Sequence, residues 1–154
     1  MIKTIILLLF ISISNISLYS QFYDIGDKIY STPSNYQIIG ISSKDNSKIY
    51  RYKDKFPTTV FSYTVDKYEI KIRDNTVVGM HFVLYPTDNN YNVVPESLIN
   101  KIKIKSGNEP LKKGIKYYFD DGSTRTIVYR KNIPDYGGDR IFIYVVSTDY
   151  LFAN

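Results

Sequence analysis

His81 is the only histidine in the chain, and an imidazole is the side chain that most often exchanges protons near neutral pH. It lies in an apolar run, on the face opposite Phe82 and beside Val83. No serine elbow, paired acid or second histidine accompanies it as a defined partner in the sequence. A structural or partly exposed histidine explains this pattern more simply. We therefore keep His81 as a catalytic candidate without assigning it a role.

Acidic residues offer two further patterns. Asp120-Asp121-Gly122 resembles part of a calcium loop, but such a loop needs alternating oxygen ligands over about a dozen residues. A hairpin turn explains the same three residues. A glycosidase needs two acids held a fixed distance apart, and the alternation of its strand places Glu69 on a solvated face. The only other glutamates are Glu96 and Glu109. The sequence predicts no metal and no cofactor, and it favours a protein that is not an enzyme.

Three tyrosines are the candidate ligand-binding residues. Tyr50 and Tyr52 alternate with basic residues in 48–53, so a strand there would present both rings on one face, as a stacking platform for sugars or bases. Tyr118 is predicted to point outward, next to a core-facing Tyr117. The alternative for all three is a half-buried ring whose hydroxyl reaches water.

The basic excess does not indicate a nucleic-acid partner. The chain has 20 basic and 15 acidic residues, a net charge of +5. Most of the basic residues are lysines, whereas nucleic-acid sites favour the forked guanidinium of arginine. We interpret the excess as a solvated surface. No phosphate loop, dinucleotide fingerprint or Gly-x-Ser-x-Gly motif is present.

The elements that would position these residues are mostly strands, because short apolar runs alternate with turn residues. Tyr68, Ile70 and Ile72 alternate strictly with charged residues, which is typical of a strand with one buried and one solvated face. Segments 77–85 and 140–147 are apolar on both faces, which predicts central strands. Further strands are predicted at 36–42, 48–53, 58–65 and 67–73, and a hairpin at 115–128 around Asp121-Gly122.

One helix is predicted. Pro95 and Glu96 suit its first turn and Gly107 suits its end. Residues 101–105 alternate like a strand, which leaves a strand as the alternative. The predicted fold is α+β, a mostly antiparallel β-sheet with one helix (about 95–106) packed on one face.

The N-terminus predicts export. Residues 1–20 combine Lys3, an apolar run from Ile5 to Phe10 and a small residue at Ser20, the layout of a Sec-type secretory signal peptide. The stretch is short and diluted with serines, so a retained membrane anchor is the less favoured alternative. No second apolar segment follows, so we expect no membrane span after signal removal, and a periplasmic or extracellular location.

Residues 21–154 have the length of a single β-rich globular domain. The absence of cysteine excludes a disulfide scaffold. The leading hypothesis is a small exported, non-catalytic binding module for a protein, an envelope component or a glycan. The alternatives are a small hydrolase that uses His81, and subunit assembly through an exposed strand edge.

Overall fold

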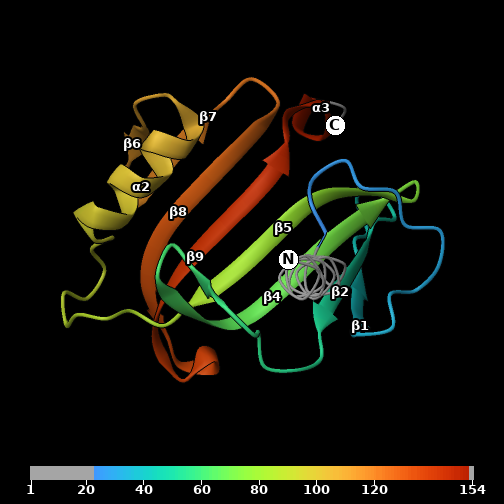
Figure 1. Cartoon of the computed structure of the whole chain (residues 1–154), viewed down its shortest axis with the longest axis horizontal. Coiled ribbons are helices and arrows are strands. Elements are labelled where there is room, and N and C mark those ends of the chain that lie inside the picture. Colours follow the sequence, from blue (N-terminus) through green and yellow to red (C-terminus); the bar gives the residue numbers. More distant parts are fainter. Residues whose placement is uncertain (1–22, 153–154) are drawn as a thin grey trace, which may run out of the picture.

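The structure, a computed structural model, describes residues 23–152, and a curved antiparallel sheet forms most of them (Figure 1). Eight strands follow one another in the order β1-β2-β4-β5-β9-β8-β7-β6, and a short β3 pairs with β4. Their bounds are β1 Tyr36–Ile41, β2 Lys48–Tyr52, β3 Thr59–Val60, β4 Tyr63–Arg73, β5 Thr76–Leu84, β6 Leu111–Lys113, β7 Lys116–Asp120, β8 Thr124–Ile133 and β9 Gly138–Ser147. The predicted α+β class, with a mostly antiparallel sheet, is confirmed.

The single strand predicted over 58–65 is wrong. The chain turns back there, so that Val60 pairs with Tyr63 in a tight β3–β4 hairpin. Phe61 and Ser62 have φ values of 52° and 73°, the left-handed conformation that two-residue hairpin turns require. Glycine, asparagine and aspartate usually occupy such positions, and none of them is present to indicate the turn in the sequence.

The predicted helix is confirmed as α2, Glu96–Ser106. It begins after Pro95 and ends at Gly107, whose φ of 75° allows its N–H to donate to the carbonyl of Lys103. Leu98 and Ile102 are its buried residues, and their spacing of four places them on one helix face. This face packs on the sheet near β7 and β8 (Figure 1).

The hydrophobic core lies on the face of the sheet that carries α2, which we call the helix face. Tyr68, Ile70 and Ile72 of β4 point to it, as the alternation predicted. The N-terminal segment covers its other end, where the Ile29 N–H donates to the carbonyl of Asn75. The opposite face, which we call the open face, carries two short helices that the sequence did not predict: η1 Pro134–Tyr136 and α3 Thr148–Phe152.

A fully buried arginine fixes the connection between β5 and α2. Arg130 lies on β8, and its guanidinium contacts Asp88 and Asp139 at 2.6 Å each. It also donates to the carbonyl oxygens of Asp88 and Val93. Buried charges are tolerated only when they are paired and hydrogen-bonded, and Arg130 meets that requirement.

The predicted signal peptide, residues 1–20, lies outside the described residues. Within the described part of the chain, no helix has the length and apolar character needed to cross a membrane.

Candidate functional site

A row of polar and aromatic side chains crosses the open face from strand to strand. Strand register places Arg51 of β2 opposite Glu69 of β4, Glu69 opposite His81 of β5, and His81 opposite Tyr144 of β9. We call these four residues the transverse row. Because directly paired residues on antiparallel strands have neighbouring side chains on one face, the sheet itself brings the four groups into contact.

Polar contacts link the first three members of the row. Arg51 contacts one oxygen of Glu69 at 2.6 Å, and the Nδ1 atom of His81 lies 3.1 Å from the other. Glu69 was predicted to face solvent, but its side chain is buried because η1 and the neighbouring strands cover this part of the open face. Burial raises the pKa of Glu69, but hydrogen bonds from His81 and Arg51 outweigh burial and hold the pKa below its ordinary value.

This network assigns the histidine tautomer. An ionised Glu69 carboxylate can only accept hydrogen bonds, so Nδ1 of His81 carries the proton it donates to Glu69. In a neutral imidazole the Nε2 atom is then an acceptor. Nε2 is shielded from solvent and has no hydrogen-bond partner among the described residues. Nε2 of His81 is therefore a buried acceptor that no described residue satisfies. An unsatisfied buried acceptor costs about 1–3 kcal/mol of stability.

Aromatic rings continue the row toward β8 and β7. His81 stacks on Tyr144 with ring centroids 3.9 Å apart and planes 6° apart. Tyr129 stacks on Phe142 in the same way, at 4.9 Å, and Lys116 lies over the Tyr129 ring at 5.3 Å. The His81 side chain is thus held on one side by stacking on Tyr144 and on the other by its hydrogen bond to Glu69.

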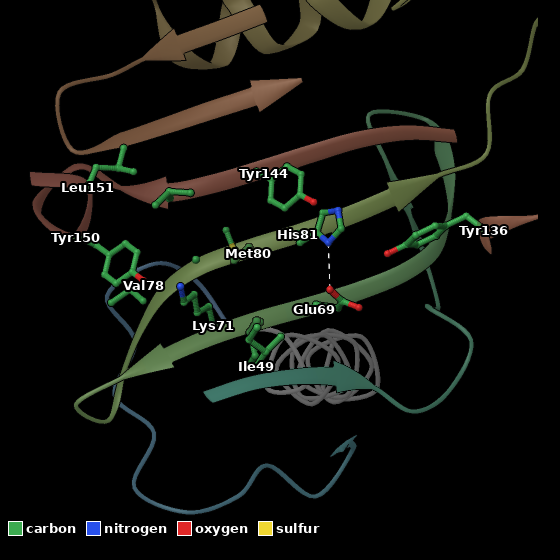
Figure 2. Close-up of a pocket in the computed structure, with 13 residues that line it drawn as sticks. Ile49, Glu69, Lys71, Val78, Met80, His81, Tyr136, Tyr144, Tyr150 and Leu151 are labelled. Carbon is green, nitrogen blue, oxygen red and sulfur yellow. Dashed lines mark hydrogen bonds and ion pairs between the residues drawn. The ribbon is translucent and has the colours of Figure 1, made fainter. Parts of the chain in front are cut away.

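A cavity of about 430 Å³ opens beside the transverse row (Figure 2). Ile49, Val146 and Leu151 give it apolar walls, whereas Glu69 and His81 contribute polar atoms. Its lining residues come from β2, β4, β5, β9, η1 and α3. No serine, threonine or cysteine is among the lining residues that the structure describes. A cavity of this size, with apolar walls and few polar groups, is typical of a small-ligand site.

Tyr136 forms one end of the cavity. Its ring packs edge-on against Phe142 at 5.6 Å, and Lys67 lies over the ring at 4.1 Å. Its hydroxyl points toward the His81–Glu69 pair (Figure 2). Burial and the nearby negative charge of Glu69 raise the pKa of Tyr136, so its hydroxyl keeps its proton and remains a donor near neutral pH.

Tyr150 of α3 forms the other end. Its hydroxyl donates to Asp45 in the β1–β2 loop, and Asp45 also lies 3.5 Å from Lys71. Hydrogen bonds from Tyr150 and Ser47 hold the pKa of Asp45 far below its ordinary range. Asp45 is therefore ionised, and it fixes α3 over the open face.

The tyrosines predicted to bind a ligand lie elsewhere. Tyr50 and Tyr52 do share one strand face, but it is the helix face, where 6% and 9% of their surface is exposed. Both belong to the hydrophobic core, where the ring of Tyr52 packs against Tyr36 at 5.3 Å. They are therefore not an accessible stacking platform. Tyr118 is half-buried, pairs with Ile127 and is not part of the cavity lining.

His81 is the one predicted site residue at the cavity. Sequence reasoning missed its partners Glu69, Arg51 and Tyr144, and also the cavity ends Tyr136 and Tyr150. In the described part of the chain, no group of three or more His, Asp or Glu side chains could hold a metal ion. No protein-family model, no curated protein and no solved structure matches this chain.

Proposed function

We propose that this protein is an exported, non-catalytic binding module that takes a small ligand in the open-face cavity. The observation that carries the proposal is the buried Glu69–His81 pair at the edge of that cavity, which the partly exposed Arg51 also contacts. Buried charged groups contribute little net stability compared with apolar residues of similar size. Perturbed carboxylates in a cleft are more common at functional sites than elsewhere.

The ligand class that suits this cavity is a glycan or a related hydroxyl-rich envelope component. Glu69 is a hydrogen-bond acceptor at the cavity, and Tyr136 supplies a donor. A sugar offers hydroxyls that both donate and accept, together with apolar ring faces that fit apolar and aromatic walls. Tyr136 and Tyr150 lie at opposite ends of the cavity (Figure 2), and its volume of about 430 Å³ favours a small molecule over a protein segment.

Export supports the same ligand class. The signal peptide predicted at residues 1–20 would deliver the protein to the periplasm or the exterior, where envelope glycans are present and nucleic acids are not expected partners. The proposed partner is therefore an envelope or extracellular molecule.

The test is a glycan and envelope-component binding screen, followed by calorimetry on the hits. Glu69→Gln should weaken binding at least tenfold because it removes the charge that orients His81. Glu109→Gln is the matched control, since it makes the same chemical change on an exposed glutamate outside the cavity. If no compound in the screen binds at about millimolar concentration, the proposal is refuted.

A small hydrolase is the second candidate, and one observation favours it. A carboxylate that accepts from Nδ1 of a histidine is the arrangement that orients a general base. Since the cavity lining contains no serine, threonine or cysteine, His81 would have to activate a water molecule, which requires its shielded Nε2 atom to become accessible. His81→Gln should then abolish turnover while ligand binding is retained. If His81→Gln loses binding and the unaltered protein shows no detectable turnover, the binding module is the better description.

A further inference from the structure

Strand β1 forms one edge of the sheet and exposes a continuous apolar strip. Among the described strands it pairs with β2 alone. Ile38, Ile39 and Ile41 expose 51%, 40% and 61% of their surface. An unpaired edge with apolar side chains is a template for another strand, and proteins usually protect such edges.

The other edge of the sheet is protected. Strand β6 is only three residues long and contains Lys112 and Lys113, and short, lysine-bearing edge strands discourage pairing. Strand β1 contains no charged residue in its six positions. The two edges therefore differ in charge, and the one protective feature of β1 is the register shift between Ile38 and Gly40.

We propose that two copies of this protein pair through their β1 strands, antiparallel and related by a two-fold axis. Because β1 is uncharged, two copies bring no like charges together within the pairing segment. Because the β6 edge is short and basic, β1 of one copy does not pair with β6 of the next, which would produce an open fibre. The only symmetric product is a closed dimer with one continuous sheet.

The packing around β1 agrees with this arrangement. Ile38 is the register partner of the core residue Tyr50, and Ile41 is the partner of Lys48. The apolar helix face thus extends to the edge and ends there in exposed isoleucines. Helix α2 lies at the far end of the sheet and does not cover them (Figure 1). A second copy would extend this face without disturbing either core.

The dimer is expected to be weak. The paired segment is six residues long, and the register shifts between Ile38 and Gly40, which limits regular pairing on either side. Small interfaces of this kind are typical of micromolar complexes. No residue of β1 lines the open-face cavity, so dimerisation and ligand binding are independent properties.

Light scattering on the purified exported protein across a concentration series from about 1 to 200 µM, the range of weak complexes, tests the proposal. The mass should rise from that of one chain to that of two. The double substitution Ile38→Lys and Ile41→Lys should keep the protein monomeric at every concentration. Ile104→Lys is the matched control, because Ile104 is 82% exposed on α2 and should leave the dimer intact. Circular dichroism would confirm that each variant is folded.

Cysteine cross-linking distinguishes the geometry, since the chain has no cysteine of its own. Single cysteines placed in turn along β1 should cross-link best at one central position, because antiparallel two-fold pairing brings only that residue opposite its own copy. Efficient cross-linking at every position would contradict antiparallel pairing. A mass that stays monomeric, or one that grows without stopping at two chains, would overturn the dimer itself.

Discussion

Replacing Glu69 with glutamine tests whether the side chains of the transverse row are coupled as their distances indicate. The carboxylate accepts from Nε of Arg51 at 2.8 Å and from Nδ1 of His81 at 3.1 Å. A glutamine amide has one oxygen and one NH₂ group. Its oxygen can accept from one of the two donors, but its NH₂ group then faces the other donor and cannot accept from it. The variant therefore loses at least one charge-assisted hydrogen bond and leaves a buried donor unpaired.

The expected cost of Glu69→Gln is about 2–3 kcal/mol in the free energy of unfolding, the range for a hydrogen bond to a charged group. The larger values of about 3–5 kcal/mol for fully buried ion pairs do not apply, because one third of the Arg51 side chain is exposed and water can replace part of its pairing. For a domain of this size, such a loss lowers the melting temperature by roughly 6–12 °C. Urea and thermal unfolding followed by circular dichroism measure both quantities.

The pH dependence gives an independent check. The pKa of Glu69 is below its ordinary value in the folded protein, so its stabilising contribution is complete above the unfolded pKa of about 4.3. That contribution is lost as the pH falls through the lower folded pKa. The stability gap between the unaltered protein and Glu69→Gln should therefore be largest near neutral pH and should narrow below about pH 4. A gap that is absent at pH 7, or the same at pH 3, would refute the reasoning.

Replacing Arg51, Glu69 and His81 together by apolar residues should not lower the free energy of unfolding. In the triple variant Arg51→Met, Glu69→Leu and His81→Phe, no buried charge is left without a partner. Apolar replacement of buried ion pairs is often neutral or stabilising, by about 1–4 kcal/mol. If the triple variant is at least as stable as the unaltered protein but binds no ligand, the row is maintained for function. A triple variant less stable than Glu69→Gln alone would show that the row is needed by the fold.

Three further changes have defined outcomes. Arg130→Met should lower the free energy of unfolding by about 3–5 kcal/mol, because it leaves the buried Asp139 without its cation; urea denaturation measures it, with Arg125→Met at an exposed pair as the control. Tyr150→Phe should cost about 1 kcal/mol and speed ligand dissociation in stopped-flow experiments, since α3 loses its hydrogen bond to the β1–β2 loop. Gly79→Ala should weaken ligand binding in calorimetry with little change in melting temperature, because a Cβ there lies 3.4 Å from the Cβ of Lys71 and 3.8 Å from the carbonyl oxygen of Val145 and occupies part of the cavity lining.

The sequence predicted most of the fold because its strands follow simple alternation. The alternating residues of β4 indicated a strand, Asp121-Gly122 indicated the β7–β8 hairpin, and Gly107 indicated the end of α2. The β3–β4 turn was missed because its left-handed residues, Phe61 and Ser62, are not of the types that usually adopt this conformation. A turn can be predicted from local sequence only where its backbone conformation is adopted by a characteristic residue type.

The site was harder to predict because it depends on register. If β4 and β5 paired regularly from the Asp74-Asn75 turn onward, Glu69 would lie opposite Met80. In the structure, Met80 lies opposite Ile70 on the helix face. The register shift between Lys71 and Ile72 moves the pairing by one residue and brings Glu69 opposite His81. A one-residue shift reverses which side chains meet across a strand pair. Such a shift has no recognisable signal in the residues around it.

Alternate residues of the same strand form the core on one face of the sheet and line the cavity on the other. Along β4, Tyr68 and Ile70 point into the core, while Glu69 and Lys71 between them point to the cavity. Period-two alternation identifies the first set correctly, but it equally suggests that the second set is merely solvated. Whether a polar face is solvated or forms a site is decided by what covers it. Here the covering elements are η1 and α3, with Tyr136 and Tyr150. These two tyrosines, remote from β4 in the sequence, turn an ordinary polar strand face into a cavity with a buried carboxylate at its edge.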